Sequence, residues 1–91
     1  MTGVSRTVLI RNRRGLHARA SAKFVTLAAT LPASVQVEKD GGTGVTGTSI
    51  MGLMMLGAAM GDSITISAEG DGADEAVGRL IELVEGKFGE E

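Results

Sequence analysis

The segment VSRTVLIRNRRGLHARASAKFVTLAATL, residues 4–31, changes its hydrophobic period in the middle and thereby decides the fold. Its first part, residues 4–10, is rich in β-branched side chains and predicts a strand that ends in a basic turn, Arg11–Gly15. From His17 onward the apolar side chains recur at helical spacing: Ala20, Phe24, Leu27, Ala28 and Leu31. This helix should end before Pro32, because proline disfavours helical backbone in the residue that precedes it.

The middle of the chain returns to an alternating pattern. Residues 33–38 predict a strand, Asp40–Gly42 supplies turn residues, and Thr43–Gly47 is expected to form a second strand. After Thr48 and Ser49, the apolar segment IMGLMMLGAAM predicts a short helix that is broken near two glycines, Gly57 and Gly61.

The last third of the chain repeats the change from strand to helix. Residues 63–68 alternate, and the positions after the following loop form one apolar helical stripe: Val77, Leu80, Ile81, Val84 and Phe88. The element order is therefore βαββαβα. Strands with one polar face favour an antiparallel sheet with the helices gathered on its other face, so we expect one α+β domain over residues 1–91.

Charge is divided unevenly along the chain. The net charge is −2, but residues 1–37 carry six basic side chains and no acidic one, whereas residues 38–91 carry three bases and eleven acids. Such a division steers a partner of opposite sign to one surface. The sequence therefore predicts phosphate chemistry or an acidic protein partner at the basic half.

His17, the only histidine, lies inside this basic half. A lone histidine is more often structural, but three local features argue for a functional role here. Gly15 permits a tight turn just before it. His17 begins the predicted helix, where free N–H groups and the helix dipole favour an anion. Arg19 follows within the same turn, and its guanidinium group suits phosphate oxygens.

The positive surroundings also suit a nucleophile that becomes phosphorylated. They disfavour the imidazolium ion and keep the ring neutral, which leaves a nitrogen lone pair free to attack. Once that nitrogen carries a phosphoryl group, the same cations and N–H groups stabilise the new anion. The pattern therefore predicts an exposed phosphohistidine at His17.

Three segments match motifs of one known family: Gly15-Leu16-His17-Ala18-Arg19, Thr48–Met54 and Asp62–Gly70. They resemble the active-site motif, the regulatory-serine segment and the last strand of the HPr family, the histidine-containing phosphocarriers of the phosphoenolpyruvate-dependent phosphotransferase system. The three motifs occur in the family's order and span nearly the whole chain. The resemblance implies an open-faced β-sandwich, a four-stranded antiparallel sheet covered on one face by three helices.

The resemblance also implies the chemistry. His17 would accept a phosphoryl group through Nδ1 from phosphorylated enzyme I and pass it to an enzyme IIA-type carrier, with Arg19 stabilising the phosphate. Such a chain is a relay without a cofactor rather than a turnover enzyme. This sequence has Ala20-Ser21 where the family usually has proline and alanine. The sugar-transport and the nitrogen-related branches both stay open.

Ser49 and the methionine-rich segment after it carry further expectations. Serine before an apolar run predicts a helix N-cap. The resemblance additionally implies phosphorylation of Ser49 by an HPr kinase/phosphorylase, which is compatible with capping because a helix N-terminus favours negative charge. By the same resemblance, an apolar patch docks the partners: Ile50, Met51 and Met54. The basic side chains expected to attract an acidic partner are Arg13, Arg14 and Lys23.

Other classes of function fit the sequence less well. An HPr-like regulatory binding module with an idle histidine is the main alternative. Nucleic-acid binding is not expected, because the chain has no Trp or Tyr and only two Phe on which bases could stack. Metal binding is not expected either, since one histidine without clustered carboxylates is a poor ligand set. No apolar run approaches about 18 residues, so a cytoplasmic protein without membrane insertion is expected.

Overall fold

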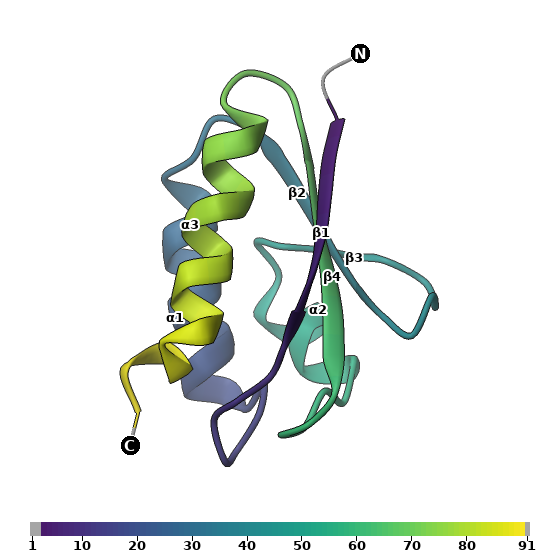
Figure 1. The fold of residues 1–91 in the computed structure, drawn as a ribbon, viewed down its shortest axis with the longest axis vertical. Coiled ribbons are helices and arrows are strands. Elements are labelled where there is room, and N and C mark those ends of the chain that lie inside the picture. Colours follow the sequence, from purple (N-terminus) through teal and green to yellow (C-terminus); the bar gives the residue numbers. More distant parts are fainter. Residues whose placement is uncertain (1–2, 91) are drawn as a thin grey trace.

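The computed structural model describes residues 3–90. Four strands form one antiparallel sheet in the order β1-β4-β2-β3, namely β1 (Gly3–Leu9), β2 (Ser34–Lys39), β3 (Val45–Thr46) and β4 (Ser63–Glu69). Three α-helices and a short 3₁₀ turn complete it, namely α1 (Ala18–Ala29), α2 (Ile50–Met55), α3 (Ala73–Glu85) and η1 (Lys87–Gly89). Helices α1 and α3 lie side by side on one side of the sheet (Figure 1). The predicted α+β class and the βαββαβα order are confirmed.

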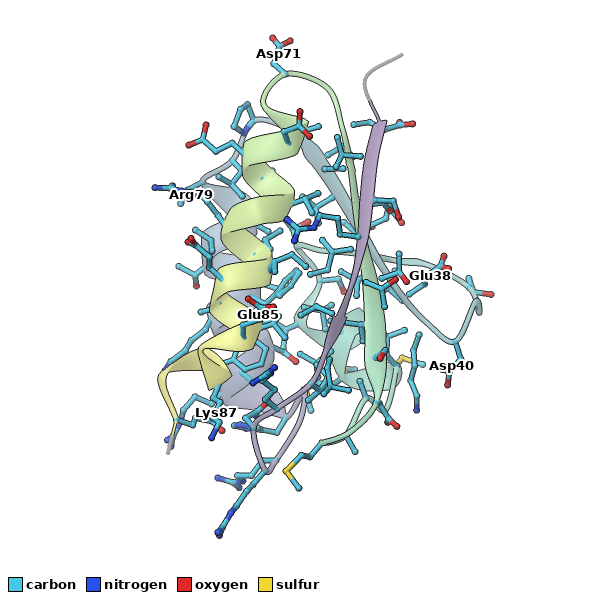
Figure 2. The ribbon with its side chains drawn as sticks, in the orientation of Figure 1. Glu38, Asp40, Asp71, Arg79, Glu85 and Lys87 are labelled. Atoms are coloured by element: carbon cyan, nitrogen blue, oxygen red, sulfur yellow. The ribbon has the colours of Figure 1, made fainter. Side chains whose placement is uncertain are left out.

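The core lies between the sheet and these helices. Alternation along β2 and β4 turns one set of side chains inward, and all of them are buried as predicted: Val35, Val37, Ile64, Ile66 and Ala68. The buried stripes of α1 and α3 pack against them, and side chains fill the space between the two layers (Figure 2). Arg79 points away from the core on the helix side, and Glu38 lies on the side of the sheet that faces away from α3 (Figure 2).

Two elements differ most from the prediction. The strand expected at Thr43–Gly47 is only Val45–Thr46, because its glycines have little strand propensity and offer no side chains to pack. The stripe expected to continue to Phe88 leaves the helix at Glu85. Phe88 is nevertheless 1% exposed, and it enters the core from η1 with a left-handed backbone, φ +55°.

The turn before α1 is held against the loop that follows α2. The Leu16 N–H donates to the Ala58 carbonyl at 3.0 Å, and the Gly61 N–H donates to the Ile10 carbonyl at 2.9 Å. Gly15 lies at φ +62° in this turn, and a Cβ there would collide with the Ala58 carbonyl oxygen. The close approach places the start of α1 beside α2.

Candidate active site

His17 occupies the N-cap position of α1. Its backbone is extended, and its Nδ1 accepts a hydrogen bond from the Arg19 N–H at 3.3 Å. Because Nδ1 is the acceptor, it carries a lone pair and the ring proton lies on Nε2. The first turn of the helix is further fixed by the buried Ser21, whose hydroxyl donates to the Leu16 carbonyl at 3.1 Å. The departure from the family motif at Ala20-Ser21 thus adds a hydrogen bond beneath the histidine.

Glu90 provides the second contact of the ring. Its Oε2 lies 2.6 Å from His17 Nε2, and its Oε1 accepts from the Asn12 side-chain amide at 3.1 Å. Asn12 is fully buried and also donates to the Gly15 carbonyl at 2.9 Å. The side chains of His17 and Glu90 are each only 18% exposed. The expectation of an exposed histidine is therefore wrong, because the side-chain carboxylate of Glu90 covers one edge of the ring.

This carboxylate changes the electrostatics predicted from the sequence. The hydrogen bond from His17, helped by the one from Asn12, holds the pKa of Glu90 below its ordinary value. Glu90 is therefore ionised at neutral pH. The sequence pattern near residue 17 contains only positive charges, so it missed this negative charge, which the fold brings from 73 residues away. Phe88 in the apolar stripe was the only signal that the tail packs against the body of the domain.

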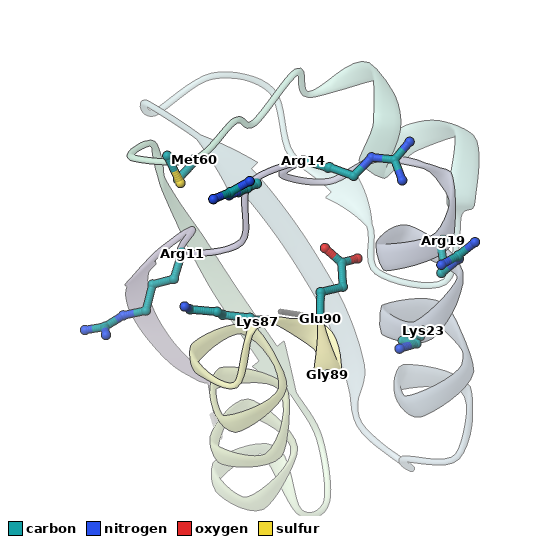
Figure 3. A pocket seen from close by; sticks show the side chains of 9 residues that line it. Arg11, Arg14, Arg19, Lys23, Met60, Lys87, Gly89 and Glu90 are labelled. Carbon is teal, nitrogen blue, oxygen red and sulfur yellow. The ribbon is translucent and has the colours of Figure 1, made fainter.

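The basic side chains surround a cleft beside the histidine. The cleft has a volume of about 720 Å³, and its charged lining comes from the turn before α1, from α1 and from the C-terminal segment: Arg11, Arg13, Arg14, Arg19, Lys23, Lys87 and Glu90. Glu90 lies in the middle, with Arg19 and Lys23 on one side and Lys87 and Arg11 on the other (Figure 3). Four of the predicted basic residues thus meet in one place. Arg11 and Lys87 also line the cleft, although the sequence had not indicated a binding role for either.

Lys23 has a more specific position than a solvated charge. Its Nζ donates to the Phe88 carbonyl at 2.6 Å and so ties α1 to the C-terminal turn. Lys23 therefore makes a structural contact in addition to lining the basic cleft.

The second predicted region lies along α2. Ser49 is the N-cap of α2, and its hydroxyl accepts from the Gly52 N–H at 3.0 Å, which confirms the capping prediction. Leu53 is fully buried and anchors the helix. Four side chains of α2 are exposed: Ile50 by 40%, Met51 by 69%, Met54 by 41% and Met55 by 80%. Met55 adds to the three apolar residues that the sequence resemblance indicated.

Among residues 3–90, no group of three or more histidine, cysteine or acidic side chains is arranged to hold a metal ion. None of the helices in that range has the length and apolar character needed to span a bilayer.

The site thus consists of one histidine that caps the first helix of a four-stranded antiparallel α+β domain, beside a basic cleft. The family model described as "PTS HPr component phosphorylation site" matches residues 4–86. The chain belongs to the HPr family of phosphotransferase-system phosphocarriers.

Relatives with two different names are similar to this chain. The phosphocarrier protein HPr of Pseudomonas aeruginosa is 43% identical over 83 residues, which cover 91% of this chain and 92% of the relative. The phosphocarrier protein NPr of Shewanella violacea is 39% identical over 90 residues, 99% of this chain and 98% of the relative. A crystal structure of HPr from Thermoanaerobacter tengcongensis has a TM-score of 0.90 and 45% identity, and the match covers 97% of this chain and 98% of that one.

Proposed function

We propose that this protein carries a phosphoryl group on Nδ1 of His17. The observation that carries the proposal is the orientation of the ring. Nδ1 keeps its lone pair at the N-terminus of α1, while the Nε2 N–H donates a hydrogen bond to Glu90. A phosphoryl group on Nδ1 would lie near the free N–H groups of the helix and near Arg19, both of which favour an anion.

The proposed donor is phosphorylated enzyme I and the proposed acceptor is an enzyme IIA-type carrier. Family membership and the two surfaces around His17 support this pair. The basic cleft suits an acidic partner, and the exposed apolar side chains of α2 suit a docking contact because methionine adapts to different surfaces. Since relatives named HPr and NPr are both similar to this chain, the acceptor belongs to the sugar-transport or to the nitrogen-related system. We place the relay in the cytoplasm, where phosphoenolpyruvate is produced.

Phosphorylation of Ser49 by an HPr kinase/phosphorylase is the proposed control of docking. Ser49 is partly exposed, and the exposed side chains of Ile50 and Met51 follow it directly. A phosphate at this position brings hydrated negative charge to the edge of an apolar contact, and it would repel an acidic partner. A penalty of about 1.4 kcal/mol weakens binding about tenfold.

The test of the carrier function is transfer from phosphoenolpyruvate in the presence of enzyme I. Wild type should gain one phosphate that is lost in acid, as expected for a P–N bond. His17→Asn should gain none. Asparagine is the better control here, because its side chain can still cap α1 whereas alanine cannot. Acid-labile labelling of the His17→Asn variant would refute the assignment.

Arg19 and Arg13 provide a matched pair for the phosphate contact. Both line the cleft and both are exposed, but only Arg19 lies on the first turn of α1. Arg19→Ala should lower the maximal transfer rate, since its guanidinium group stabilises charge on the moving phosphoryl group. Arg13→Ala should act mainly through encounter with enzyme I, and added salt should mimic it. Equal effects of the two variants at every salt concentration would contradict this arrangement.

Transfer to IIA proteins of the two branches then decides the acceptor.

Ser49→Asp should raise the apparent Michaelis constant of enzyme I for this protein more than it lowers the maximal rate. Ser49→Ala, its control, should transfer almost normally. Unchanged binding of the Asp variant would leave Ser49 as a helix cap alone.

A further inference from the structure

The contact between Glu90 and His17 is built by the fold rather than by a loose tail. Phe88 is buried, and three consecutive residues at this end have left-handed backbone, with φ +60° at Lys87, +55° at Phe88 and +77° at Gly89. Such backbone is unfavourable for residues other than glycine and persists only where packing enforces it. The bond from Lys23 to the Phe88 carbonyl adds a second restraint. The turn therefore delivers Glu90 to a defined place.

The carboxylate is restrained at both oxygens. Oε1 is bound by the Asn12 amide and Oε2 by the Nε2 of His17. Only one ring tautomer satisfies both neighbours of the imidazole, because Nδ1 has to accept from the Arg19 N–H while Nε2 has to donate to Glu90. Glu90 lies outside the residues 4–86 that match the family model, so the family match assigns it no role.

The charges that face the ring make this carboxylate distinctive. Within residues 3–90, every other charged side chain lining the cleft is basic: Arg11, Arg13, Arg14, Arg19, Lys23 and Lys87. These cations would favour loss of the Nε2 proton from a ring that has become positive. Glu90 is the group of opposite sign in direct contact with that proton.

We propose that Glu90 is a positioning residue that keeps the proton on Nε2 during phosphoryl transfer and thereby sets the reactivity of phosphorylated His17. The proposal depends on the carrier function proposed above. In the first step, the Nδ1 lone pair attacks phosphorus, and the bond from phosphorus to the donor breaks with its electron pair returning to the donor. The ring then carries the phosphoryl group on Nδ1, a proton on Nε2 and one positive charge.

In the second step, the proton on Nε2 decides how good a leaving group the imidazole ring is. A nucleophile of the acceptor attacks phosphorus, and the N–P electron pair returns to Nδ1. If Nε2 is still protonated, the leaving group is a neutral imidazole. If the proton has been lost, the leaving group is an imidazolate anion, which is much poorer. By holding the proton on Nε2, Glu90 keeps the leaving group a neutral imidazole and so favours transfer of the phosphoryl group to the acceptor.

The test compares Glu90→Gln with Glu82→Gln. Both variants remove one negative charge, but Glu82 is exposed on α3 and does not line the cleft. Each protein is phosphorylated with phosphoenolpyruvate and enzyme I. Phosphorus-31 NMR then follows the titration of the phosphorylated ring, and the rate of hydrolysis is measured at each pH.

Loss of a contacting opposite charge should move the ring titration of phosphorylated Glu90→Gln to lower pH by about one unit. Above both midpoints, hydrolysis and return of the phosphoryl group to enzyme I should therefore be about tenfold slower than in wild type. Below both midpoints the two proteins should converge, because their rings are then protonated alike. Glu82→Gln should follow wild type throughout.

Three results would overturn the inference. A pH profile of Glu90→Gln identical to that of wild type would show that the carboxylate does not hold the proton. A rate lowered by the same factor at every pH would indicate a purely structural effect. Nitrogen-15 NMR of unphosphorylated wild type showing the proton on Nδ1 would contradict the tautomer independently of phosphorylation. If wild type itself gains no phosphate on His17, the proposed function fails and this inference fails with it.

Discussion

Replacing Gly15 with alanine tests the contact that positions His17. A Cβ at this position would collide with the Ala58 carbonyl oxygen and would lie 2.8 Å from the Ala59 Cα. These are backbone atoms that cannot rotate away. The same Ala58 carbonyl accepts the Leu16 N–H at 3.0 Å, so any shift that relieves the clash also disturbs this hydrogen bond.

Gly57 supplies the matched control. Its φ of +67° is close to the +62° of Gly15, but a Cβ at Gly57 would meet nothing within 4 Å. Left-handed backbone costs an alanine about 1–2 kcal/mol at either position. Only Gly15→Ala adds the weakened hydrogen bond, about 1 kcal/mol, and the strain of overpacking, about 1–3 kcal/mol. Gly15→Ala should therefore lose about 2–4 kcal/mol more free energy of unfolding than Gly57→Ala.

Urea denaturation of both variants measures this difference. Transfer from enzyme I should also fall in Gly15→Ala, since a displacement of about 1 Å at a reacting group can cost about a hundredfold in rate. If the two variants lose equal stability, the approach of Gly15 to Ala58 does not constrain the turn and the argument is wrong. A large loss of stability with normal transfer would show instead that His17 tolerates movement of the turn.

Three further predictions follow from individual contacts. Ser49→Ala should lose about 1 kcal/mol of stability through its missing cap, whereas Thr48→Ala, which removes no side-chain hydrogen bond seen in residues 3–90, should lose almost none in the same urea titration. Leu53→Ala should cost about 2–5 kcal/mol because Leu53 is fully buried, and Met55→Ala, at 80% exposure, should stay within about 0.5 kcal/mol. The hydrogen bond from His17 lowers the pKa of Glu90 from 4.5. The contribution of this bond to folding stability is therefore present above pH 4.5 and is lost as the pH falls through the lowered pKa. The melting temperatures of Glu90→Gln and wild type should differ at neutral pH and converge in acid.

The periodicity of the chain was enough to predict the elements and most of the core. Alternation of apolar residues identified β2 and β4, helical spacing identified α1 and α3, and Ser49 was correctly expected to cap α2. These features depend on neighbours within one turn of helix or one strand, so the local sequence contains the information. The placement of His17 at the start of α1 was predictable for the same reason.

The environment of His17 was decided by the tertiary structure. Nothing near residue 17 indicates that a carboxylate binds its Nε2, because Glu90 arrives from the other end of the chain. Its position depends on Phe88 entering the core with a left-handed backbone and on Lys23 binding the Phe88 carbonyl. Hydrophobic spacing predicts that Phe88 is buried, but it does not report the backbone direction of the following residues. That direction, set by packing in three dimensions, places a negative charge against the histidine in the most basic part of the chain.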